Sequence, residues 1–74
     1  MAGPSAQAFL RVNGQIEPLN SSTLSAILSE KEITETTRGV AVAINGTVIP
    51  RAQWPSMRIS AGDEIEIVRV RQGG

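Results

Sequence analysis

The chain has 74 residues, with seven Lys or Arg and seven Asp or Glu, so its formal net charge is zero. Zero net charge argues against electrostatic binding of nucleic acid, because such binding calls for a basic surface. The sequence contains no Cys and no His, which excludes disulfides, the usual zinc sites and a nucleophile–base pair built on either residue. At this length we expect one domain with a mainly aliphatic core.

No apolar run is as long as a membrane span and no signal peptide opens the sequence, so we expect a cytoplasmic protein without a membrane partner. The lack of Cys fits the reducing environment of that compartment. Residues 1–6 are small and polar, which predicts a disordered leader. We expect the folded domain to cover residues 7–71, and residues 72–74 to form a flexible tail.

The first predicted element is a β-hairpin. Apolar and other side chains alternate over residues 8–12, which is typical of a strand. Asn13-Gly14 then supplies the two positive-φ residues of a type I′ turn. The return strand, residues 16–19, contains Pro18, which cannot donate a hydrogen bond to a neighbour. This strand should therefore lie at the edge of a sheet.

A short amphipathic helix is predicted next. Leu24, Ile27 and Leu28 recur at positions i, i+3 and i+4, so they share one face of a helix. Hydroxyl side chains at residues 21–23 can cap its amino end, and we expect Ser22 to be the cap. A polar connection leads from the helix to the next strand.

Residues 40–49 predict a second hairpin, again turned by Asn-Gly, with Val40, Val42 and Ile44 on its buried face. The following segment has no steady period, and we expect Trp54, Met57 and Ile59 to point inward. A turn at residues 61–63 precedes the last strand, residues 64–70. In that strand Ile65 and Ile67 should face the core, packing with Leu10, Val12 and Ile44 against the helix.

The order of hairpin, helix, hairpin, irregular segment and strand is that of the β-grasp fold of ubiquitin-like proteins. Three motifs, "VNGQ", "GVAVAINGTVIPRAQW" and "GDEIEIVRVRQGG", resemble the ThiS-type sulfur carrier proteins of thiazole (thiamin) biosynthesis, from about Gln7 to Gly74. The resemblance implies an α+β fold in which one main helix packs on one face of a mixed sheet.

The resemblance also implies a chemistry for the C-terminus. In the family, an ATP-using adenylyltransferase related to ubiquitin-activating enzymes adenylates the terminal carboxylate. A persulfide sulfur from a donor protein displaces AMP and leaves a thiocarboxylate, whose sulfur thiazole synthase takes. Gly74 would be the modified residue, and Gln72 and Gly73 would enter the partner sites with it. The chain would then be a co-substrate rather than an enzyme, and ATP would be bound by its partner rather than by the chain, which needs no cofactor or metal of its own.

A docking surface is expected on the sheet face opposite the helix. The resemblance places the last strand between the first and the third, so outward side chains of these strands would form one exposed patch: Phe9, Arg11, Ala41, Ala43, Val68 and Val70. The alternative is a solvated face that carries apolar residues by chance.

Three other functions stay open at this point. The sulfur-carrying small subunit of molybdopterin synthase shares the fold and the tail, although "PRAQW" and the short length favour thiazole synthesis. A ubiquitin-like modifier would form isopeptide bonds with lysines. A passive interaction module would not need its tail. For the sulfur carrier we expect a monomer when the chain is free.

Overall fold

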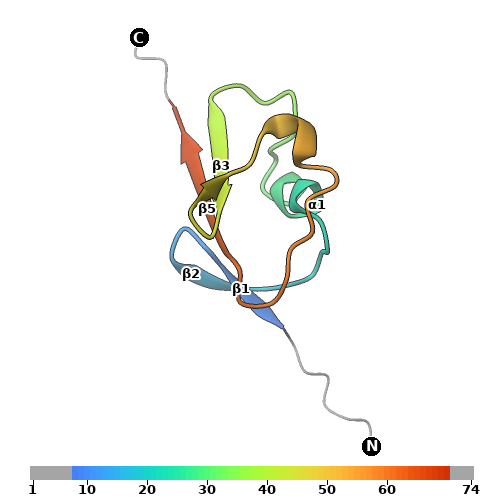
Figure 1. Cartoon of the computed structure of the whole chain (residues 1–74), viewed down its shortest axis with the longest axis vertical. Helices are drawn as coiled ribbons and strands as arrows, with labels where there is room; N and C mark the ends of the chain where they lie inside the picture. Colours follow the sequence, from blue (N-terminus) through green and yellow to red (C-terminus); the bar gives the residue numbers. More distant parts are fainter. Residues whose placement is uncertain (1–7, 71–74) are drawn as a thin grey trace, which may run out of the picture.

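The computed structural model describes residues 8–70. Five strands form one mixed sheet in the order β2-β1-β5-β3-β4 (Figure 1). Their bounds are β1 Phe9–Val12, β2 Gln15–Pro18, β3 Val40–Ile44, β4 Thr47–Val48 and β5 Glu64–Arg69. β5 runs parallel to β1 and antiparallel to β3. The last strand is therefore central in the sheet, as the β-grasp arrangement requires, and β2 with its Pro18 lies at an edge as predicted.

Both predicted hairpin turns are confirmed by their backbone angles. Asn13 and Gly14 have φ values of 52° and 83°, and Asn45 and Gly46 have values of 51° and 87°. Positive φ at both central residues is what a type I′ turn needs, and its twist matches that of the flanking strands.

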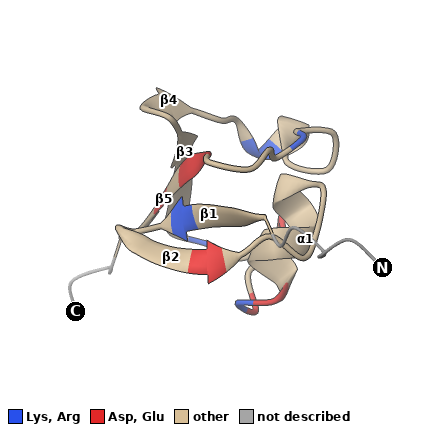
Figure 2. Cartoon of the chain, turned by 90° about the horizontal axis from the view of Figure 1, so that it is seen from below, with Lys and Arg blue, Asp and Glu red and all other residues tan. Residues whose placement is uncertain are grey.

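One helix, α1 (Leu24–Ser29), lies on one side of the sheet, together with the short 3₁₀ helix η1 (Arg51–Gln53). Seen from below, both lie on the same side, and within residues 8–70 no helix covers the other face of the sheet (Figure 2). One face of the sheet is therefore buried and the other faces outward, as the alternating strands indicate.

The predicted helix cap, Ser22, is wrong by one residue. Thr23 caps α1, because its hydroxyl accepts a hydrogen bond from the Ala26 backbone N–H at 3.3 Å. The extended residues before the helix pair with the irregular segment: Thr23 bridges Arg58, and the Ser22 carbonyl accepts from the Ile59 N–H at 2.9 Å. This pairing keeps the chain extended through Thr23, so the helix begins one residue later than expected.

The core lies between the sheet and α1. Its buried apolar residues in the described part of the chain are Leu10, Val12, Leu24, Ile27, Leu28, Ile33, Val40, Val42, Ile44, Ile49, Trp54, Ile59 and Ile65. Trp54 is buried, as expected, and its indole N–H donates to the Ile49 carbonyl at 3.0 Å. Met57 and Ile67 are only partly buried and pack at the margin of this cluster. Ile67 therefore faces inward as predicted but is not a central core residue.

Ile33 is a core residue that was not predicted, because it lies in the connection after α1 that was expected to be polar. α1 ends in a reversal in which Glu32 has a φ of 64°, and the Ile33 N–H returns to the Leu28 carbonyl at 2.9 Å. Such a six-to-one hydrogen bond after a left-handed residue is typical of a Schellman motif, and it brings an apolar residue back against the helix. Ile33 is 1% exposed as a result.

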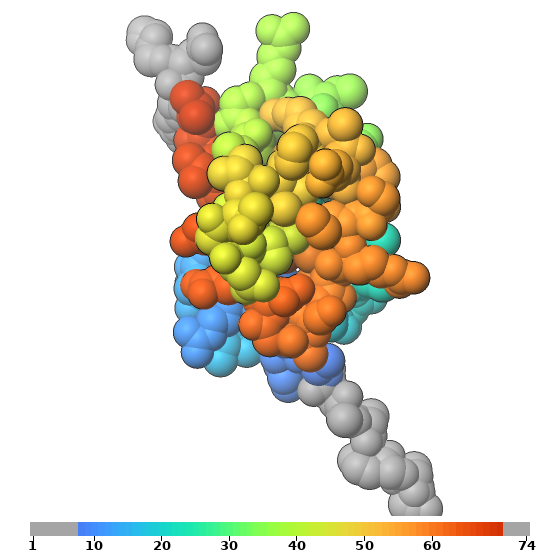
Figure 3. Space-filling view, in the orientation of Figure 1, coloured from blue at the N-terminus to red at the C-terminus, as the bar shows by residue number. Residues whose placement is uncertain are grey.

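The segment between β4 and β5 completes the cover of the core. It contributes Ile49, Trp54 and Ile59 to the buried cluster. In the space-filling view it forms a continuous orange surface beside the yellow-green hairpin of β3 and β4 (Figure 3). The segment has no strand or α-helix of its own, so its place depends on these three buried side chains and on the pairing with residues 22–24.

Candidate functional site

The C-terminal end of β5 is held against the start of β3. The Val70 N–H donates to the Gly39 carbonyl at 2.6 Å. Gly39 has a φ of 72°, and a Cβ at this position would lie 2.7 Å from the Val70 carbonyl oxygen. Only glycine fits such a close approach of two backbones. The residues predicted to carry the chemistry follow in the sequence, and Gln72, Gly73 and Gly74 lie outside the described residues, as does the expected leader.

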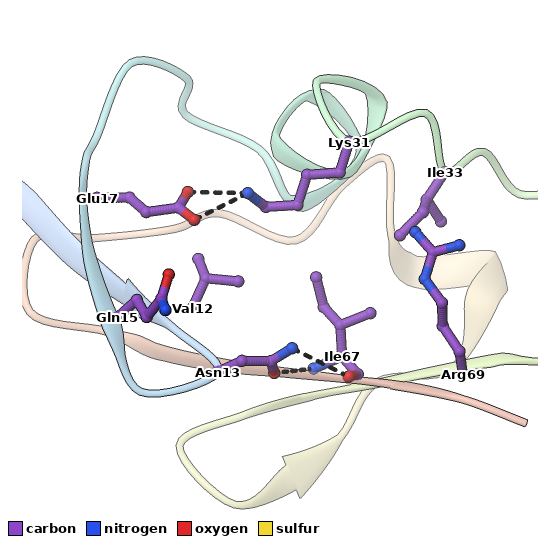
Figure 4. A pocket seen from close by; sticks show the side chains of 8 residues that line it. All are labelled: Val12, Asn13, Gln15, Glu17, Lys31, Ile33, Ile67 and Arg69. Carbon is purple, nitrogen blue, oxygen red and sulfur yellow. Dashed lines mark hydrogen bonds and ion pairs between the residues drawn. The ribbon is translucent and has the colours of Figure 1, made fainter.

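The two turn asparagines also bind β5, a role that the sequence pattern did not predict. The Asn13 side chain accepts from the Ile67 N–H at 2.8 Å and donates to the Ile67 carbonyl at 3.3 Å (Figure 4). The Asn45 side chain accepts from the Glu64 N–H at 2.9 Å and donates to Asp63 at 3.1 Å. Both hairpin tips therefore fix the strand that leads to the C-terminus.

A cleft of about 470 Å³ lies on the inner side of the sheet beside the last residues of β5 (Figure 4). Its apolar walls come from Val12, Ile33 and Ile67. The Lys31 ammonium and the Glu17 carboxylate form an ion pair, with distances of 2.9 and 3.0 Å to the two oxygens. The cleft therefore joins the first hairpin, the end of α1 and β5 at the place where the chain leaves the sheet.

The outward residues predicted as a docking patch all lie on the face without a helix, but they do not form one group. Arg11 lies opposite Glu64 on β5, whereas Val68 lies opposite Ala41 on β3. Val68 is thus four residues beyond Glu64, about 13 Å along the strand. The expectation of a single patch was wrong because β1 pairs with only the first part of β5.

The first of the two groups contains Phe9 and Arg11, and the second contains Ala41, Ala43, Val68 and Val70. The large apolar members are exposed, at 47% for Phe9, 55% for Val68 and 61% for Val70. Ala41 is exposed as well, whereas Ala43 is half-buried. On β5 the exposed carboxylates Glu64 and Glu66 lie between the groups. We call the second group, together with Val48, the upper patch.

Two large exposed residues of this face were missed from the sequence. Ile16 lies opposite Arg11, and Val48 lies opposite Ala43, so the register turns both side chains outward. They are 65% and 68% exposed. The sequence contained the information needed to predict this. A two-residue Asn-Gly turn fixes which residues of the two strands lie opposite each other, and pairing outward from each turn gives this register.

Arg51 in the "PRAQW" motif connects three parts of the fold. Its guanidinium donates to the Glu35 carbonyl at 2.8 Å and to the Val40 carbonyl at 3.1 Å. It also lies 4.9 Å from the centre of the Trp54 ring, within the range of a cation–π contact. The motif therefore stabilises the segment that leads into Gly39 and β3.

Along the described ribbon, Lys and Arg positions are interspersed with Asp and Glu positions rather than gathering by sign (Figure 2). Within residues 8–70, no three side chains of the metal-binding types gather into a possible site. No helix in this part of the chain has the length and apolar character needed to cross a membrane.

Comparisons with known proteins agree with this geometry. The model of the ThiS family matches residues 8–74. The sulfur carrier protein ThiS of Thermus thermophilus is 33% identical over 63 residues, which cover 85% of this chain and 95% of that protein.

Solved structures show the same relationship. The crystal structure of a thiamine biosynthesis protein (ThiS) from Geobacter metallireducens superposes with a TM-score of 0.73 at 25% identity, covering 89% of this chain and 99% of that one. A solution structure of a thiamine biosynthesis protein from the same organism gives a TM-score of 0.70 at the same identity and covers 87% of its own chain. The sequence match, the shared β-grasp sheet and the family motifs lead to one conclusion: the chain belongs to the ThiS family of small ubiquitin-like sulfur carrier proteins.

Proposed function

We propose that this protein carries sulfur as a thiocarboxylate on Gly74 and donates it for thiazole formation in thiamin biosynthesis. The observation that carries the proposal is the family match, which extends through the Gly-Gly at residues 73–74. The two solved structures from Geobacter metallireducens are of a thiamine biosynthesis protein, which supports the thiamin pathway over molybdopterin synthesis. A sulfur carrier is consumed and regenerated by its partners, so we propose the role of a co-substrate.

The chemistry accounts for the need of an activating partner. An α-carboxylate is anionic at neutral pH and is a poor acyl donor, because its leaving group would be oxide. Attack of the Gly74 carboxylate on the α-phosphorus of ATP releases pyrophosphate and forms an acyl-adenylate. A persulfide sulfur then attacks the acyl carbon and AMP leaves. Cleavage of the resulting S–S bond by a thiol leaves the thiocarboxylate.

The partners follow from these steps: an adenylyltransferase related to ubiquitin-activating enzymes, a persulfide donor and thiazole synthase. The upper patch is the proposed docking surface. Ala41, Val48 and Val68 form an apolar area there with a shallow hollow of about 230 Å³. Val68 lies on β5, the last strand, and precedes Gln72 by only four residues in the sequence. The cytoplasm stays the predicted compartment.

Intact-mass measurement tests the proposal directly. The full chain is incubated with its cognate activating enzyme, ATP and a persulfide donor, and the expected result is a mass gain equal to the difference between sulfur and oxygen. The gain should require ATP and should disappear when Gly74 is removed. A mass that never changes with an enzyme shown to be active would contradict the sulfur-carrier function.

A further inference from the structure

β5 extends beyond the part of its length that pairs with β1. The parallel pairing of the two strands ends at Val12 and Ile65, and the Asn13 N–H makes the last backbone contact, donating to the Ile65 carbonyl at 2.9 Å. β5 continues to Arg69 with β3 on its other side. From this point to the end of β5, no strand in the described part of the chain lies beside that edge.

The hydrogen-bond pattern shows which backbone groups face that edge. The Glu64 carbonyl accepts from the Asn45 N–H, and the Val70 N–H donates to Gly39, so even-numbered residues of β5 bond to the β3 side. In an antiparallel pair the residues between them face the opposite side. Ile67 and Arg69 therefore turn their N–H and carbonyl groups toward the edge that β1 has left.

Asn13 replaces the missing strand at Ile67. Its side-chain oxygen accepts from the Ile67 N–H at 2.8 Å and its side-chain amide donates to the Ile67 carbonyl at 3.3 Å (Figure 4). Only an amide side chain of this length can both accept and donate in this way, and Asn also tolerates the φ of 52° that the turn requires. Asp at this position could accept but not donate at neutral pH.

We propose that Asn13 is a positioning residue for the C-terminal tail, and this inference rests on the proposed function. Its side chain holds Ile67 on the edge opposite to β3, two residues before β5 ends at Arg69, and so restricts the direction in which the strand continues through Val70. A strand end held on both edges binds the activating enzyme with little further ordering, whereas one held only by β3 must be ordered during binding. Asn13 would thus act through β5 and would not touch ATP.

Asn45 provides a matched control within the same chain. It has the same turn type, a φ of 51°, and a side chain that binds β5, but it holds Glu64 at the far end of the strand. Gly fits both turns, so Asn13→Gly and Asn45→Gly each remove a side-chain clamp and keep the turn. The two variants should lose similar stability but differ in their effect on the tail.

The experiment measures ATP–pyrophosphate exchange by the cognate activating enzyme at varied concentrations of the full chain, at a temperature where all variants are folded. Asn13→Gly should raise KM about tenfold with kcat within about twofold, the sign of lost binding rather than lost chemistry. Asn45→Gly should leave both constants near those of the parent. Asn13→Asp, which keeps one of the two bonds, should lie between the parent and Asn13→Gly.

A second readout is independent of activity. Nuclear magnetic resonance order parameters of the Val68 and Arg69 amides should fall in Asn13→Gly and not in Asn45→Gly. An unchanged KM in Asn13→Gly, equal KM increases in both Gly variants, or unchanged order parameters would each overturn the inference while leaving the proposed function intact. A parent chain that supports no exchange would overturn the proposed function, and the inference with it.

Discussion

Arg51 holds together two backbone segments that are separate in the sequence. The guanidinium binds carbonyls from two segments, Glu35 in the connection after α1 and Val40 at the start of β3, and it lies over Trp54. A planar fork with several donors suits two acceptors and an aromatic ring at once, whereas an ammonium group is a single point of charge. The residue serves the fold near Gly39, where the end of β5 is held.

Replacing Arg51 by Lys should therefore destabilise the protein although the charge is kept. We expect a loss of about 1.5–3 kcal/mol in the free energy of unfolding, the range for hydrogen bonds to a charged group. Urea denaturation followed by tryptophan fluorescence measures it. Arg58→Lys is the control, because Arg58 is exposed and the described structure gives its side chain no hydrogen bond; it should change stability by less than about 0.5 kcal/mol. Equal losses of stability in Arg51→Lys and Arg58→Lys would contradict the proposed role of the Arg51 guanidinium.

Gly39→Ala tests the contact at the end of β5. Ala would adopt an unfavourable positive φ, which costs about 1–2 kcal/mol, and its Cβ would also meet the Val70 carbonyl. Gly62→Ala is the matched control, since Gly62 has a φ of 87° and no atom within 4 Å of the added Cβ. Denaturation midpoints should fall in both variants, and clearly further in Gly39→Ala. If the two losses are the same, the close approach to Val70 does not limit this position.

At the scale of the strands, the outer face and the core face of β5 should respond differently to charge. Val68→Asp places a carboxylate on the exposed upper patch, where water solvates it in the free protein, but a docked partner would desolvate it. Affinity for the activating enzyme should drop by at least about tenfold, while stability changes by less than about 1 kcal/mol. Calorimetric titration and urea denaturation give the two quantities.

Two further variants complete this comparison. Ile65→Asp puts the charge at a side chain that is 0% exposed, so the domain should unfold. Phe9→Asp lies in the other exposed group, and a weaker effect on affinity than that of Val68→Asp would assign docking to the upper patch. If Phe9→Asp weakens binding more, the partner lies over the opposite end of the sheet.

The strands and their faces were predictable from the sequence because alternation has a period of two and each hairpin carries Asn-Gly. Ile33 was not, because a Glu rather than a Gly occupies the left-handed position that returns the chain to Leu28. Division of the outer face into two groups was not predictable either. It depends on the parallel register of β1 and β5. These strands are separated by more than fifty residues, so no local sequence pattern predicts how they align.

At the scale of the molecule, the part that folds and the part proposed to react are separate in the sequence. The buried core side chains of the described chain lie between Leu10 and Ile65. The proposed reactive residues, 72–74, come after the last residue of β5 and contribute none of these side chains. The β-grasp domain would thus supply the docking surface and hold β5, while the partner supplies the groups that activate the carboxylate.

Removing residues 72–74 should therefore convert the protein into an inhibitor of its own activation. The truncated chain keeps its core, so its free energy of unfolding should stay within about 0.5 kcal/mol of the parent. It also keeps the upper patch but has lost Gly74. Added to ATP–pyrophosphate exchange with the full chain as substrate, it should raise the apparent KM and leave kcat unchanged, because both chains compete for one docking surface. The same truncation carrying Val68→Asp should inhibit at least about tenfold more weakly. A folded truncated chain that does not inhibit would show that the activating enzyme binds mainly the tail, and the docking role proposed for the upper patch would then be wrong.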